Sequence, residues 1–360
     1  MNHHVRPKQA EGTLDIVGFL QLEPSSVTQA RILSFRHFCL REAQLKLACR
    51  RCGIAVWLDR LPAASISRIA EAPVFSELLS SGDTASDAAR ELLLGWIDAE
   101  SCLVGERPSG HFEWTALGDY RFAQSGRLAY VAPRMHGLVL DSGSPCVLAP
   151  PLLPPEKRVR TRPLTDFGPA RAKLGEALAL IDLAAPIGVE MVLGTLRVIH
   201  LYAEDRPGFS SGSPRRYPGI TSLGNAHSPS TSPHQVADAL LHEATHSVLY
   251  LAEVDTPFFR TAEIETPRVI SPWTGANLAM HSFAHACCVW YELANFWARM
   301  LETGDRHPET LHLLRRSASG FLKQEYEDAL MLIAGGITPF CRELLEGLAV
   351  DVRSQWGGTA

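Results

Sequence analysis

The sequence contains no uninterrupted apolar run long enough to cross a membrane, and its first residues lack the apolar core of a secretory signal. Its formal net charge is only −5, so it offers no strong attraction for nucleic acid or for an anionic membrane. It also has no internal repeat and no low-complexity tail. These absences favour a cytoplasmic protein whose partner is neither a nucleic acid nor a membrane.

The eight cysteines are scattered and do not form a disulfide framework. Cys49 and Cys52 have CxxC spacing, but no second CxxC completes a zinc ribbon, and the segment has a helical pattern. We therefore expect reduced, partly buried thiols, and the same holds for Cys287 and Cys288.

The composition excludes global disorder, because 46% of the 360 residues are hydrophobic and 20% are charged. The pattern predicts an α+β protein that is predominantly helical, with small antiparallel β elements. A proline-rich connector at 150–155 divides a helical N-terminal region with β-hairpin elements (1–150) from a metal-binding catalytic region (151–360), or the two form one continuous domain. Before the connector, we expect helices in 26–58 and 72–104 and strands at 127–131 and 137–140. After it, we expect helices at 170–183, 278–300, 309–316, 322–334 and 338–356, strands at 191–202 and 220–223, and a mobile loop at 206–219.

Residues 242–246 read His-Glu-Ala-Thr-His, an HExxH motif inside an apolar run. Residues four apart on a helix share one face, so His242 and His246 can bind one metal ion while Glu243 lies beside it. Ser232 and Gln235 form a capping box, and Pro233 suits the first helical position. These helix-start signals predict that the motif lies in a helix.

A second histidine pair, His281 and His285, is also four apart within the predicted helix 278–300. Two such helices can cross so that three or four side chains converge on one ion, which predicts a metal site between the HExxH helix and this second helix. Alternatively, His281 and His285 are core or surface histidines, or the Cys288 thiol is the third ligand.

The usual interpretation of HExxH is a zinc peptidase in which Glu243 is the general base. No His-xx-Gly-xx-His continuation follows the motif, although Glu292 on the later helix could supply a carboxylate ligand. A non-catalytic helical protein that binds a partner is a third hypothesis, and the intact motif argues against it.

Several segments together resemble the HExxH family encoded beside genes for ribosomally made, modified peptides. They are 240–250, Ser271-Pro272-Trp273-Thr274-Gly275, 281–287, Asn295-Phe296-Trp297 and Gly335-Gly336-Ile337-Thr338-Pro339. The resemblance covers most of the chain and is weakest before residue 26 and around 206–219. It implies a 2-oxoglutarate-dependent iron hydroxylase that acts on the β-carbon of a peptide residue.

The resemblance implies His242, His246 and His285 as iron ligands, with open positions for 2-oxoglutarate and O2. His281, one turn before His285, is then either a neighbour of the ligands or the third ligand itself. Glu243 would hydrogen-bond a metal-bound water or orient the co-substrate.

The distal carboxylate of 2-oxoglutarate requires a cation, for which Arg260 and Arg268 are the candidates, or they are solvated surface arginines. The resemblance implies arginines just after the Pro-Trp pair, where this chain has Thr274-Gly275-Ala276-Asn277. The partner is expected to be a precursor peptide, possibly with its leader, that adds a strand at the edge formed by 220–225. The arginine-bearing loop 206–219 would close over an acidic peptide, or it is a disordered linker. The sequence leaves the oligomeric state open.

Overall fold

The computed structural model describes residues 14–357 apart from 81, 83, 107–109, 111–112, 146–160 and 261–263. The connector predicted at 150–155 lies outside the described residues. The chain forms two compact units, each made of separate stretches of sequence. Unit 1 consists of Met1–Leu33, Ala177–Val192 and Leu240–Ala360, and unit 2 consists of Ser34–Glu176 and Leu193–Ala239.

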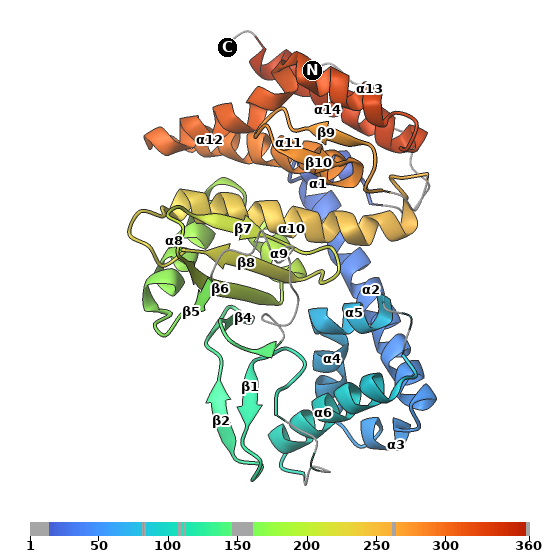
Figure 1. Cartoon of the computed structure of the whole chain (residues 1–360). Coiled ribbons are helices and arrows are strands. Elements are labelled where there is room, and N and C mark those ends of the chain that lie inside the picture. The colour runs from blue at the N-terminus through green and yellow to red at the C-terminus, as the bar shows by residue number, and fades with distance from the viewer. Residues whose placement is uncertain are drawn as a thin grey trace. The chain divides into compact units, whose positions relative to one another are not determined.

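The described helices and strands are labelled along the chain in Figure 1. The first part contains α1 (Ile16–Leu20), α2 (Pro24–Arg51), α3 (Ala55–Leu58), α4 (Ala63–Glu71), α5 (Pro73–Ser80), α6 (Asp87–Leu103), β1 (Tyr120–Phe122), β2 (Leu128–Val131), β3 (Arg134–Met135), β4 (Leu138–Asp141) and β5 (Thr161–Pro163). The second part contains α8 (Gly168–Ala184), α9 (Pro186–Thr195), β6 (Val198–Glu204), β7 (Ser210–Gly212), β8 (Ile220–Gly224), α10 (Pro233–Asp255), β9 (Arg268–Ile270), β10 (Asn277–Ala279), α11 (Met280–Glu302), α12 (Pro308–Ser319), the 3-10 turn η2 (Gly320–Leu322), α13 (Gln324–Ile333) and α14 (Pro339–Trp356).

Unit 2 contains a mixed sheet that, within the described residues, has six strands in the order β3-β4-β6-β8-β7, with β5 also paired to β6. The pairs β4–β6 and β6–β8 are parallel, whereas β7 pairs antiparallel with β8. All five residues of β8 are buried, as is typical of a central strand in a parallel arrangement. Figure 1 shows this sheet in green and yellow-green.

Two sequence predictions in this region are wrong. The expected strand 191–202 begins inside α9, which ends at Thr195, and only its second half belongs to β6. The apolar pattern of 191–202 cannot separate a buried helix end from a buried strand. The expected mobile loop 206–219 contains β7, which occupies the edge of β8, so the predicted strand 220–223 exists but offers no free edge for a peptide.

A buried ion network joins the helices of unit 2 to the loop before β1. The Arg68 guanidinium donates to Glu100 at 3.0 Å and to Asp119 at 2.8 Å, and Arg134 also donates to Asp119. The Asp119 side chain is fully buried, and burial alone would raise its pKa. The hydrogen bonds and charge of Arg68, the Thr115 hydroxyl and the charge of Arg134 outweigh burial, so the pKa of Asp119 is lowered.

The core of unit 1 is built around α11. Its large apolar side chains are buried, and it packs against α1, α12 and α14. The Tyr291 hydroxyl donates to Asp351 on α14 and accepts a hydrogen bond from the Gln21 amide at 2.7 Å. The short strands β9 and β10 form an antiparallel pair directly before α11. The segment that carries the second histidine pair is therefore a buried structural helix.

The expectation of a predominantly helical α+β protein is confirmed, but the sheet is larger than predicted and includes parallel pairs. Parallel strands need long crossover segments, which single-sequence patterns reveal poorly. None of the described helices is both long and apolar enough to cross a membrane. None of the described cysteines forms a disulfide bond, and this includes Cys49 and Cys52.

Candidate metal centre

The HExxH motif lies in the middle of α10, and this helix begins where the sequence predicts. The Gln235 N–H donates to the Ser232 hydroxyl at 3.0 Å, and the Ser232 N–H donates to the Gln235 side-chain oxygen at 3.1 Å. This is the reciprocal capping box expected from the sequence. The helix then presents His242 and His246 on one face.

The two imidazoles of the motif face each other through their Nε2 atoms, which are 3.2 Å apart. A ring nitrogen lies about 1.1 Å from its ring centre, so two nitrogens pointing straight at each other would put the centres about 5.5 Å apart. The observed separation of the ring centres is 4.9 Å, which is shorter. The Nε2 lone pairs are therefore tilted away from the line between the two Nε2 atoms. Two nitrogens bound at about 2.0–2.1 Å to one tetrahedral ion lie about 3.3 Å apart, and this pair therefore fits a divalent metal.

A carboxylate oxygen of Glu243 completes a group of potential ligands. This oxygen and one nitrogen from each of His242 and His246 all lie within 4.8 Å of one another. Glu243 is buried, with 2% of its surface exposed, whereas both histidines are half-buried. Imidazole nitrogens bind both Fe(II) and zinc, and a carboxylate beside them can hydrogen-bond a metal-bound water.

His285 does not approach the Nε2 pair but contacts the opposite side of His246. The Nδ1 atoms of His246 and His285 are 3.3 Å apart, and the ring planes differ by only 18°. His285 Nε2 lies 2.5 Å from a carboxylate oxygen of Glu253 on α10. The structure thus places His285 beside His246 but away from the Nε2 pair, where the sequence had suggested a third ligand, and adds Glu253, which the sequence did not indicate.

His281, the other histidine of the pair, lies one turn before His285, and their ring centres are 5.9 Å apart. Its Nδ1 is 4.0 Å from the Glu265 carboxylate. Glu292, which the sequence suggests as a zinc ligand, is fully buried on α11. Among the described residues, it does not belong to a group of three or more side chains whose potential ligand atoms lie close together.

Aromatic rings enclose the histidines. Tyr250 stacks on His246 with ring centres 6.0 Å apart and lies 4.9 Å from His285, while Trp290 meets His242 edge-on at 5.9 Å. Burial is the main reason that the pKa of His246 lies well below its usual value, and the neighbouring imidazoles lower it further. His246 is therefore neutral in the metal-free protein, as a metal-binding imidazole must be.

The two arginines singled out in the sequence lie on exposed segments of unit 1. The Arg268 guanidinium donates to the backbone carbonyl of Asn277 at 2.6 Å, and Arg260 follows the bridge between Phe259 and Ile337. Arg316, which the sequence did not indicate, lies over the Trp290 ring at 4.8 Å. Arg316 and His242 therefore both contact the Trp290 indole.

The buried thiols of α11 do not suit a metal site. Burial is the main cause that raises the pKa of Cys288 above its usual value, and the Glu253 carboxylate adds to the effect. Among the described residues, Cys288 does not belong to a group of three or more potential ligand atoms, so the structure does not favour it as the third ligand.

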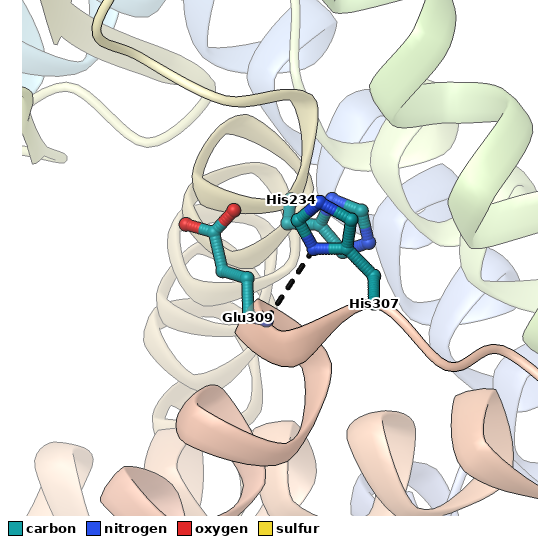
Figure 2. Close-up of side chains that lie close together, drawn as sticks. All are labelled: His234, His307 and Glu309. Carbon is teal, nitrogen blue, oxygen red and sulfur yellow. Dashed lines mark hydrogen bonds between the residues drawn. The ribbon is translucent and has the colours of Figure 1, made fainter.

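Another histidine and carboxylate lie close together at the start of α12 (Figure 2). His307 is the N-cap of this helix, and its Nδ1 accepts a hydrogen bond from the Glu309 backbone N–H at 3.3 Å. This bond uses one of the two ring nitrogens for capping. His307 could not be identified from the sequence, because a histidine cap has no distinctive spacing.

Comparisons with protein-family models and with curated proteins found no match.

Proposed function

We propose that the chain is a non-haem Fe(II) enzyme that uses 2-oxoglutarate and O2 to hydroxylate the β-carbon of a residue in a ribosomally made peptide. The observation that carries the proposal is the convergence of His242 Nε2, His246 Nε2 and the Glu243 carboxylate in one group of ligand atoms. Zinc accepts the same donors, and the resemblance of α11 and of the segment before it to peptide hydroxylases favours iron.

Iron bound at this group supplies the redox chemistry that couples two oxidations to the reduction of O2. One oxidation converts 2-oxoglutarate to succinate and CO2, and the other replaces a C–H bond of the peptide by C–OH. The two oxygen atoms of O2 end in succinate and in the new hydroxyl. The reaction needs no further reductant.

The chain's own residues would hold and shield this chemistry. His242 and His246 would offer imidazole nitrogens to the metal, and Glu243 would accept hydrogen bonds beside them from water or co-substrate. Tyr250 stacks on His246 and Trp290 packs against His242 in a T-shaped pair, which would limit the access of water.

Arg316 is the cation that the geometry favours for the distal carboxylate of 2-oxoglutarate. Its guanidinium lies over the Trp290 ring, which also forms a T-shaped pair with His242. A planar guanidinium can bind a carboxylate through two parallel hydrogen bonds. The Arg268 guanidinium, by contrast, already donates to a backbone carbonyl on the paired strand β10.

The partner would be a precursor peptide that binds in an extended form.

The test begins without any peptide. Protein purified without oxygen is given Fe(II), 2-oxoglutarate and then O2, and succinate is measured. Peptides encoded beside the gene are added next, and their mass is followed. The proposal predicts succinate that depends on iron and a peptide that gains one oxygen atom. It is wrong if neither product forms with protein that binds iron.

A zinc peptidase is the second candidate, because the Glu243 carboxylate lies beside both histidine nitrogens, as a general base for metal-bound water would. Protein loaded with zinc and incubated with the same peptides without 2-oxoglutarate distinguishes the two. Cleavage under these conditions supports the peptidase.

A further inference from the structure

Three side chains from α10 and α11 form a row that ends at the metal-binding face. Glu253, His285 and His246 follow one another at 2.5 Å and 3.3 Å. The His285 side chain is 1% exposed and that of Glu253 is 12% exposed, so solvent hardly competes for these contacts. Each member is therefore placed to hydrogen-bond the next.

The contact between His246 and His285 differs in kind from the contact between His246 and His242. Its ring centres are 5.5 Å apart, which is about the distance expected when two ring nitrogens 3.3 Å apart point straight at each other. The rings are also nearly coplanar, at 18°. This is the geometry of an N–H···N hydrogen bond. The Nε2 atoms of His242 and His246 are also within hydrogen-bond distance, at 3.2 Å, but their ring centres are closer, at 4.9 Å, and the rings are inclined at 60°.

The direction of the proton in each bond follows from the carboxylate at the end of the row. An ionised carboxylate only accepts, so His285 must donate from Nε2. A neutral His285 then has its lone pair on Nδ1 and must accept from His246 Nδ1–H. A neutral His246 is left with its lone pair on Nε2, the atom that faces His242.

We propose that Glu253 acts through His285 to fix His246 as the tautomer whose Nε2 is free to bind the metal. Glu253 and His285 are positioning residues in this account, and the inference rests on the proposed metal site. Ring packing supports the arrangement, because Tyr250 and Phe258 lie 4.9 Å and 6.0 Å from the His285 ring. They hold the imidazole so that its two nitrogens stay directed at Glu253 and His246.

The direct test uses metal-free protein labelled with nitrogen-15 at histidine, because the nitrogen resonances show which ring nitrogen carries the proton. We expect His246 to be protonated at Nδ1 and His285 at Nε2. Protonation of His246 at Nε2 in the wild-type protein overturns the inference. This readout needs neither metal nor activity, so it stands even if the proposed reaction is wrong.

The second test measures the affinity for Zn(II) and Co(II) by competition with a chromophoric chelator. Glu253→Gln keeps the size of the side chain but can donate as well as accept, so it no longer enforces the tautomer. We expect affinity to fall about 10- to 100-fold in Glu253→Gln and Glu253→Ala, with one site per chain retained. Asp255→Asn removes a charge from the exposed end of the same helix and serves as the control, with unchanged affinity expected.

His285→Ala separates the two roles of this histidine. A positioning residue leaves one weakened metal site, and its effect is not additive with that of Glu253→Ala. Complete loss of the site in His285→Ala, with wild-type affinity in both Glu253 variants, shows that His285 is itself a ligand and overturns the inference. Failure of the wild-type protein to bind any metal instead contradicts the proposed function.

Discussion

Glu243→Gln distinguishes the two enzymatic hypotheses. The substitution keeps the size of a side chain that is only 2% exposed, so packing is retained and the change is mainly the loss of a negative charge. Hydrogen bonds to a charged group contribute about 1.5–3 kcal/mol, against about 1 kcal/mol for neutral ones. If Glu243 only hydrogen-bonds water or co-substrate, the loss is about 1 kcal/mol, or about fivefold in rate.

A general base has a larger effect, because its removal lowers the rate about 10²- to 10⁴-fold. The assay compares wild-type and Glu243→Gln protein at equal iron content, with succinate and hydroxylated peptide as products. We expect one iron per chain in both and a rate within about tenfold. A loss of three orders of magnitude with full iron content would refute the reasoning and assign proton transfer to Glu243.

Three further predictions concern both units. Arg316→Ala should raise the concentration of 2-oxoglutarate needed for half-maximal succinate formation about 10- to 100-fold without changing the affinity for iron. Arg315→Ala, at the exposed neighbouring position, is the control and should change neither quantity. Equal effects of the two substitutions would argue against the clamp. Arg68→Ala leaves the buried Asp119 carboxylate with fewer partners. It should therefore lower the free energy of unfolding, measured by urea titration, by about 3–5 kcal/mol, and a change below about 1 kcal/mol would contradict this. Burial lowers the pKa of His200 to about 4. Below pH 6.5, His200 therefore binds a proton in the unfolded chain while it remains neutral in the folded chain. Stability should therefore fall between pH 6.5 and about 4, by at most about 3 kcal/mol from this group, and His200→Gln should remove that part of the fall in urea titrations at each pH.

Local signals predicted the helix that carries the candidate metal-binding residues. The capping box at Ser232 and Gln235 is a short-range pattern, and the structure reproduces both of its hydrogen bonds. The spacing of four residues in His242–His246 is likewise a local property of a helix. The presence of this helix therefore followed from the sequence.

The remaining features depend on long-range packing. The pattern at 220–225 indicated a strand but could not show that β7 covers it, because pairing partners lie outside the strand itself. Glu253 was missed for a similar reason: its role appears only when α11 brings His285 within 2.5 Å. The same crossing places His285 against Nδ1 of His246, and helical spacing alone cannot decide which ring nitrogen is approached.

The source of the new oxygen atom tests the central claim most directly. The protein is supplied with Fe(II), 2-oxoglutarate, a peptide encoded beside its gene and O2 labelled with the heavy isotope of oxygen, in unlabelled water. The masses of the products are then measured by mass spectrometry. The account predicts one heavy oxygen atom in the peptide and one in succinate, and neither product when His242 and His246 are both replaced by Ala. Peptide fragments that carry oxygen from water, formed without consumption of 2-oxoglutarate, would contradict it.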